Sequence, residues 1–130
     1  MIDALLLLTL ALLFGGMVLY SFGFAAFLFS AMPADLAGPL LRKAFPHFYM
    51  FVLLTALIAA AFAGFVDAAM ASVLLTIALT TAVTRQVLMP AINRATDAGA
   101  KTSFKWLHSL SVLITLGHIG AVAYILVGLT

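Results

Sequence analysis

Four polar side chains recur at helical spacing near the end of this chain. They are His108, Ser111, Thr115 and His118, which are offset by 0, 3, 7 and 10 positions. At about 100° per residue, these offsets place all four within an arc of roughly 80° on one helix. Because a polar stripe gains nothing by facing lipid tails, we expect it to face a helix bundle or a wet cavity. There, its histidines would hydrogen-bond or exchange protons with a polar solute.

The expected depth of each polar residue in the bilayer helps to decide whether its role is functional or structural. His118 lies about 15 Å beyond His108 along a helix, near the middle of a bilayer. An ionisable group at that depth is a functional hypothesis by default. Ser111 and Thr115 are explained equally well as hydroxyls that bond their own helix backbone. His108 lies nearer to water and also fits an interfacial anchor.

The composition requires lipid around most of the chain. Of the 130 residues, 66% are hydrophobic and only 8% are charged, whereas a soluble domain carries about 25% charged residues. The length predicts one domain over residues 1–130. The absence of cysteine excludes disulfides and thiolate chemistry. The few basic residues do not predict nucleic-acid binding, and the lack of a nucleophilic triad or phosphate loop favours a non-enzymatic role.

Four continuous apolar stretches predict an all-α integral membrane protein, a four-transmembrane-helix bundle. They cover residues 4–31, 47–66, 68–89 and 106–129. Each approaches or exceeds the ~20 residues that cross the hydrocarbon, and none alternates as a barrel strand would. Since Asp3 is the only early charge, the first stretch is expected to be a retained helix and not a cleaved signal peptide.

The connections between these helices contain most of the polar residues. Asp67 marks a tight turn between the second and third helices. Pro90 either stops the third helix or kinks it and lets it continue to Asp97. Residues 32–46 contain three prolines and are expected to hold a short interfacial helix. The apolar side of this helix would be formed by Leu36, Leu40 and Leu41.

All cations of the chain fall in two segments on one side of this topology. They are Arg42, Lys43, Arg85, Arg94, Lys101 and Lys105. The positive-inside rule places the basic loops 32–46 and 90–105 in the cytoplasm and both termini on the non-cytoplasmic side. We therefore expect a multi-pass protein of the cell (inner) membrane, with lipid as its constant partner. An aromatic belt at the same boundary is formed by Phe45, Phe48, Tyr49, Phe104 and Trp106.

Two further helix faces carry polar groups. Tyr20 offers a hydroxyl on a face of the first helix that also holds Thr9, Gly16, Gly23 and Phe27, and close packing is its favoured explanation. The third helix has a threonine ladder at i, i+4 spacing, which is typical of backbone-bonded residues but could line a path. The ladder consists of Thr76, Thr80 and Thr84. Arg85 and Asn93 are expected at the inner mouth of such a path.

No cofactor is predicted, although haem and copper are not excluded. The weak candidate ligands are His47, His108 and His118. His108 and His118 lie too far apart on one helix to ligate one haem iron, whereas His47 and His108 both open helices at the inner surface. Methionines near that surface would suit Cu(I), but methionine is also an ordinary core residue. No spacing is diagnostic.

Several motifs resemble those of the transmembrane protein 205-like family, a membrane domain of unknown function. They are Phe-Pro at 45–46, Met-Pro-x-Ile-Asn at 89–93 and Phe-x-x-Leu-His-x-x-Ser at 104–111. The resemblance covers nearly the whole chain and implies a four-helix membrane protein. That family usually has Asn at position 115 and often Gln at position 118, which implies a need for hydrogen bonding at these positions. The motif residues that it emphasises are Pro46, Tyr49, Pro90, Asn93, His108 and Ser111.

The leading hypothesis is binding or transport of a small polar solute or ion along the stripe of the fourth helix. Four helices are few for alternating access, so we expect a homo-oligomer or a larger membrane complex. Two alternatives stay open. The first is an accessory or structural subunit of a larger membrane complex. The second is a haem- or copper-binding redox protein.

Overall fold

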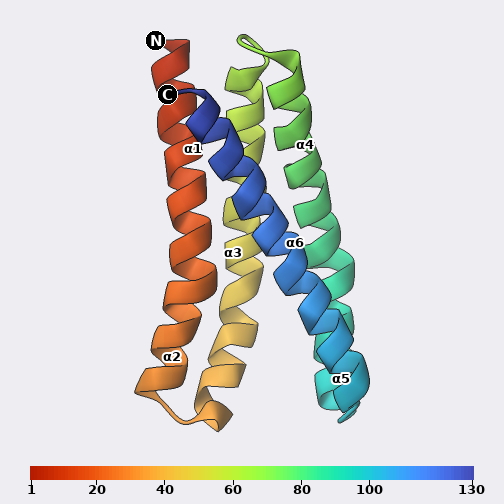
Figure 1. The fold of residues 1–130 in the computed structure, drawn as a ribbon. Coiled ribbons are helices and arrows are strands. Elements are labelled where there is room, and N and C mark those ends of the chain that lie inside the picture. The colour runs from red at the N-terminus through yellow and green to blue at the C-terminus, as the bar shows by residue number, and fades with distance from the viewer.

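The computed structural model describes all 130 residues as four long helical rods without a strand (Figure 1). Each rod is long and apolar enough to cross a membrane, which confirms the predicted all-α fold. Rods of this composition imply a lipid environment. Two of them contain a π-helical turn, η1 or η2. In chain order, the elements are α1 (Ile2–Val18), η1 (Leu19–Phe24), α2 (Ala25–Ala31), α3 (Ala34–Ala63), α4 (Ala68–Val83), η2 (Thr84–Leu88), α5 (Met89–Asp97) and α6 (Lys101–Gly128).

The first basic segment is helical. α3 is 30 residues long and passes through Pro39 and Pro46 without a break. The prediction of a separate interfacial helix and a second helix starting at 47 is therefore wrong. A helix of this length measures about 45 Å, whereas the hydrocarbon is about 30 Å thick. The extra turns project beyond the lipid, where water can bind the carbonyls that proline leaves without a donor.

The third rod continues through Pro90, which confirms the second of the two alternatives for this proline. In η2, the backbone N–H of Met89 bonds the carbonyl of Thr84, five residues earlier. Pro90 follows directly and has no N–H to donate, so the change of hydrogen-bond register accommodates it inside a continuous rod. α5 then extends to Asp97. The second basic segment, predicted as a loop over 90–105, is therefore a helix, a short turn and another helix.

Asp67 begins α4 at the predicted tight turn. Its Oδ1 accepts hydrogen bonds from the backbone N–H of Ala69 at 2.8 Å and from that of Met70 at 3.4 Å. These groups are among the N–H donors that the first turn of a helix leaves unpaired. The hairpin between α3 and α4 is thus fixed by the one charged residue in it, as predicted.

Gly99 forms the turn between α5 and α6. Its φ of 67° is the left-handed conformation that glycine adopts without strain. The N–H of Ala100 bonds the carbonyl of Ala95 at 2.9 Å, and the N–H of Gly99 bonds that of Thr96 at 3.1 Å. This pairing is a Schellman ending, which closes a helix in three residues. α6 therefore starts at Lys101, earlier than the predicted start at 106.

α6 crosses the bundle diagonally (Figure 1). It packs against α5 at one end and against α1 at the other, while α3 packs between α1 and α4. Both termini lie at the same end of the molecule. The core consists of apolar side chains from all four rods, and among its fully buried members are Leu6, Leu10, Leu13, Met17, Phe48, Val52, Leu74 and Val122.

Small residues allow the closest helix contacts. A Cβ on Gly16 would overlap the far end of the Phe51 ring, so any larger residue in this contact between α1 and α3 would have to push that ring aside. Ala59 and Ala63 are fully buried in the core. The packing role expected of the first helix therefore holds at Gly16. In contrast, Gly117 on α6 has no neighbour within 4 Å of an added Cβ.

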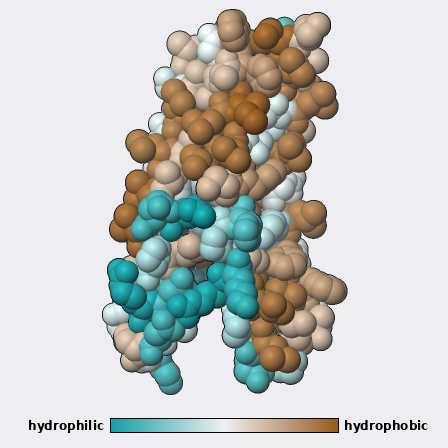
Figure 2. All heavy atoms as spheres, turned by 180° about the vertical axis from the view of Figure 1, so that it is seen from behind, coloured by the Kyte–Doolittle hydropathy of each residue, from teal (hydrophilic) through white to brown (hydrophobic).

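Hydrophilic residues gather at one end of the molecule, opposite the termini. Figure 2 shows them around a hollow between two projecting parts, with hydrophobic residues covering most of the remaining surface. Arg42 on α3 and Asp97 on α5 connect the two basic segments. Their bidentate ion pair has N–O distances of 2.7 and 3.0 Å. The cations thus share one end of the bundle, as the four-helix topology predicts.

Candidate functional site

His118 on α6 and Thr80 on α4 form a polar contact between two membrane-spanning helices. His118 Nε2 lies 2.7 Å from Thr80 Oγ1. The imidazole is half-buried. His118 lies ten residues before the end of α6, which is about 15 Å along the helix. If the bilayer ends where α6 ends, this depth is near its middle.

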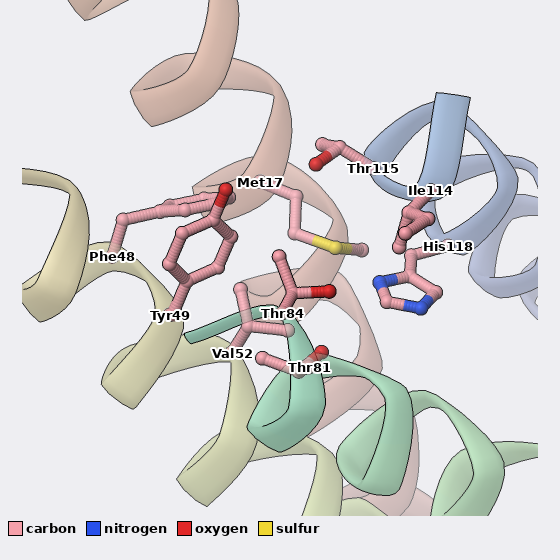
Figure 3. A pocket seen from close by; sticks show the side chains of 9 residues that line it. All are labelled: Met17, Phe48, Tyr49, Val52, Thr81, Thr84, Ile114, Thr115 and His118. Atoms are coloured by element: carbon pink, nitrogen blue, oxygen red, sulfur yellow. The ribbon is translucent and has the colours of Figure 1, made fainter. Parts of the chain in front are cut away.

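A second hydrogen bond of Thr80 determines which nitrogen of the His118 ring carries the proton. The Thr80 hydroxyl donates to the carbonyl oxygen of Thr76 at 2.8 Å. A hydroxyl carries a single hydrogen, so Thr80 then accepts and His118 Nε2 donates. In the neutral ring, Nδ1 is left as an acceptor. No residue of the chain hydrogen-bonds Nδ1, and Figure 3 shows the ring beside Met17 and Thr84.

Side chains from all four rods enclose a small cavity beside this ring (Figure 3). Its volume is about 10 Å³, and a water molecule needs roughly 10–15 Å³ on this measure. The cavity therefore has room for about one water-sized molecule. Its lining consists of Met17 from α1, Phe48, Tyr49 and Val52 from α3, Thr81 and Thr84 from the third rod, and Ile114, Thr115 and His118 from α6.

Three threonines contribute hydroxyls to this lining. Thr81 is only 1% exposed, and its Oγ1 has no hydrogen-bond partner. Thr84 instead donates to the carbonyl of Thr80 at 2.8 Å. Thr115 is half-buried, and Figure 3 shows its hydroxyl oxygen on the side of Met17. The cavity thus combines the buried, unpartnered hydroxyl of Thr81 and the half-buried hydroxyl of Thr115 with a free imidazole nitrogen.

The polar stripe of the fourth helix is divided. Thr115 and His118 line the cavity, whereas His108 is exposed and stacks on Phe104 with ring centroids 5.4 Å apart. Ser111 is buried, but its hydroxyl donates to the carbonyl of His108 at 2.7 Å. Ser111 therefore matches the structural explanation, and the four residues do not line one continuous path.

Arg85 and Asn93 lie on the basic side of the cavity and outside its lining. Arg85 directly follows Thr84, and its Nε donates to the carbonyl of Pro46 at 3.1 Å. Its Nη1 donates to Oε1 of Gln86 at 2.7 Å. Asn93 is half-buried on α5, beyond Pro90. Arg85 thus connects the third rod to α3 at the end of the bundle where a mouth was expected.

Tyr20 belongs to an aromatic cluster and not to the cavity. Its hydroxyl donates to the carbonyl of Ala44 at 2.8 Å and so ties the first rod to α3. Phe48 and Tyr49 belong to both the cluster and the cavity lining, while the other rings lie further toward the basic end. The cluster therefore fills the contact between the first rod and α3 on the basic side of the cavity. Its members are Tyr20, Phe24, Phe45, Phe48 and Tyr49.

A wider groove lies on another side of His118, between α4 and α6. Its volume is about 390 Å³. The hydroxyls of Thr76 and Thr80 in this groove both bond carbonyls of their own helix. The threonine ladder is thus backbone-bonded, as is typical, and Thr80 also contacts His118. The groove is lined by Val73, Thr76, Ile77, Thr80, Ile114, His118 and Ala121.

The three histidines are not gathered into one metal site. His47 and His108 are exposed, on α3 and α6, and His118 is engaged with Thr80. No group of three or more His, Cys, Asp or Glu residues is placed to hold a metal ion. These candidates therefore do not form a three-residue metal site.

Among the features not foreseen from the sequence are two cavity residues and one ion pair. Thr81 lies beside the predicted ladder, but its i, i+4 spacing pointed to Thr80 and Thr84 instead. Nothing in the sequence distinguished Met17 from the other apolar residues of the first helix. The ion pair between Arg42 and Asp97 joins residues 55 positions apart, a separation at which sequence spacing carries no information.

Comparison with known proteins gives one match. Residues 8–101 match the family described as "Domain of unknown function (DUF4149)". The matched region covers most of the first three rods and ends at the first residue of α6, so it contains Thr80 and Thr81 but not His118. No curated protein and no solved structure matches the chain.

Proposed function

The chain belongs to the DUF4149 family, and we propose that it binds a water-sized polar species at His118 and allows it to cross the bilayer. One observation carries the proposal. A half-buried histidine in the middle of a membrane-spanning helix faces a cavity to which all four rods contribute. Intramembrane ionisable groups that face a bundle interior typically mark binding sites or paths.

The size of the cavity narrows the solute class. A volume of about 10 Å³ suits a water-sized species, and larger solutes would require the helices to separate. The proposed role of His118 is to hydrogen-bond the solute through Nδ1 while Thr80 holds the ring through Nε2. With both nitrogens hydrogen-bonded in this way, the orientation of the His118 ring is fixed.

A route from the basic end is part of the proposal. In this proposal, the solute enters through the hollow at that end (Figure 2) and passes the aromatic cluster to reach the cavity. Movement of the cluster would connect the two. The hydroxyl of Tyr20 holds the first rod to α3 at Ala44. In our proposal, this hydrogen bond must break before the cluster can move. Arg85 and Asn93 would border the opened mouth.

The orientation of the chain in the membrane and its relationship to a second family are also proposals. The shared end of the cations supports a cytoplasmic basic end, with both termini outside, in the cell membrane. We also propose a relationship to the transmembrane protein 205-like family on the motifs at 45–46, 89–93 and 104–111, and two of the motif residues lie beside the site. Pro46 accepts a hydrogen bond from Arg85, and Tyr49 lines the cavity. A homo-oligomer would supply additional helices for a path.

Flux through proteoliposomes tests the proposed function. Osmotic water flow is followed by light scattering, and proton leak by a trapped pH-sensitive dye. We expect the protein to raise one of these rates above that of protein-free vesicles, and His118→Leu to remove the increase. His108→Leu is the matched control and should keep it, because His108 is exposed outside the cavity. Equal rates for wild type and His118→Leu would overturn the proposal.

A role as a subunit of a larger membrane complex is the second candidate. The groove between α4 and α6 favours it, as do Gly117 and Gly120, beside which no other helix packs. A neighbouring helix could approach closely at such positions. Purification in mild detergent should then yield a stoichiometric partner protein, whereas an isolated monomer that conducts would exclude this role.

A further inference from the structure

The cavity beside His118 combines a buried hydroxyl without a partner and an imidazole nitrogen without a partner. Thr81 Oγ1 is enclosed and makes no hydrogen bond, although most threonines of the third rod bond their own helix. An unpaired buried polar group costs about 1–3 kcal/mol in proteins. Such an atom that points into a cavity is typical of a site that binds a ligand.

We propose that Thr81, Thr115 and His118 hold one structural water molecule in this cavity. This inference rests on the proposed site at His118 but not on any flux. The water would accept hydrogen bonds from the hydroxyls of Thr81 and Thr115 and donate one to His118 Nδ1. Three partners are the usual number for a buried water. The cavity volume of about 10 Å³ excludes a larger ligand without rearrangement.

The chemistry of the lining favours water over an ion. No carboxylate lines the cavity, and hard cations need several oxygen ligands, usually including carboxylates. No lysine or arginine lines it either, as an anion would need. Two neutral hydroxyls that can donate and one nitrogen that can accept instead match the two lone pairs and one of the two hydrogens of water.

The water would also complete a chain of contacts across the bundle. Thr80 holds the ring from the α4 side through Nε2, and the water would connect Nδ1 to Thr81, the next residue of α4. His118 would thus be bonded at both nitrogens to neighbouring positions of one helix. This double attachment fixes α6 where its direct packing against α4 is sparse.

Water-edited solid-state NMR of the protein in lipid bilayers tests this inference. Magnetisation from mobile water should reach the His118 ring early in wild type and be lost in Thr81→Val, which removes the hydroxyl but keeps the shape. Thr76→Val is the matched control and should retain the transfer, because Thr76 lies in the groove and bonds its own helix.

Thermal unfolding gives an independent test, because a hydrated and a dry Thr81 hydroxyl predict opposite changes in the unfolding midpoint of Thr81→Val. If the hydroxyl holds water, Thr81→Val lowers the unfolding midpoint. If the hydroxyl is dry and unpaired, the same change raises the midpoint, because an unsatisfied buried group has been removed. A raised midpoint, or no water transfer to His118 in wild type, would overturn the inference. Neither measurement depends on flux, so a bound water without conduction would overturn the proposed function alone.

Discussion

His118 Nε2 and Thr80 Oγ1 lie 2.7 Å apart although 38 residues separate them in the chain. This contact joins the fourth rod, which lies outside the matched family region except for its first residue, to the third rod, which lies inside it. Because α6 crosses diagonally, the two helices meet only sparsely near this point. The pair therefore positions α6 as well as the imidazole.

A double-mutant cycle should detect this contact. Hydrogen bonds between helices in membranes contribute about 0.6 kcal/mol on average and up to about 1.7 kcal/mol. We expect His118→Leu and Thr80→Val to show a coupling free energy in that range when unfolding is measured in mixed micelles. Strictly additive effects would show that the side chains do not interact. His118→Leu with Thr9→Val is the control, since Thr9 bonds only its own helix.

Adjacent glycines on α1 should respond oppositely to alanine. Gly15→Ala places a Cβ in open space and should stabilise the helix by up to about 1 kcal/mol. Gly16→Ala places a Cβ against the far end of the Phe51 ring and displaces it from its packing, so it should destabilise the protein by about 1–3 kcal/mol. Free energies of unfolding for the two variants decide the matter. Similar changes would contradict the packing of α1 on α3.

The cap of α4 should depend on an oxygen and not on a charge. Asp67→Ala removes the acceptor for the N–H groups of Ala69 and Met70 and should cost about 1 kcal/mol. Asp67→Asn keeps a capping oxygen and should be close to neutral. Thermal midpoints of the two variants provide the comparison. A loss of equal size in both would assign the effect to the charge instead.

The membrane orientation can be read with single cysteines, because the chain has none of its own. We expect a cysteine at Lys101 to react with an impermeant maleimide only after the cell membrane is opened. A cysteine at Phe65, beside the Asp67 turn, should react in intact cells. The reverse pattern would place the basic end outside and contradict the positive-inside assignment.

Apolar length and charge position made much of the fold predictable. Four uninterrupted apolar runs and the lone Asp67 between two of them determine the rods and one turn. The ends at the basic side were harder, because proline inside a helix is costly where lipid surrounds it but tolerated where water reaches the backbone. Hence α3 continues through Pro39 and Pro46, contrary to the prediction, while Pro90 follows one of the two expected alternatives.

The sequence predicted only those residues of the candidate site that recur at helical spacing on α6. Helical spacing identified His118 and Thr115, but it could not reveal that Ser111 bonds the His108 carbonyl or that His108 faces outward. Those outcomes depend on how α6 is rotated and tilted, which packing against other rods determines. The same holds for Thr81, whose role follows from the cavity alone.

The most direct test measures the distance between His118 and Thr80 in a bilayer. The protein carries ¹⁵N-labelled histidine and ¹³C-labelled threonine, with His47→Gln and His108→Gln leaving His118 as the only histidine. Rotational-echo NMR should show strong dephasing between Nε2 and a threonine side chain, and Thr80→Val should remove this strong component, leaving only the slower dephasing from the more distant threonines of the cavity. Absence of dephasing in the Thr80 protein would show that His118 turns away from α4, and it would contradict the account of this site.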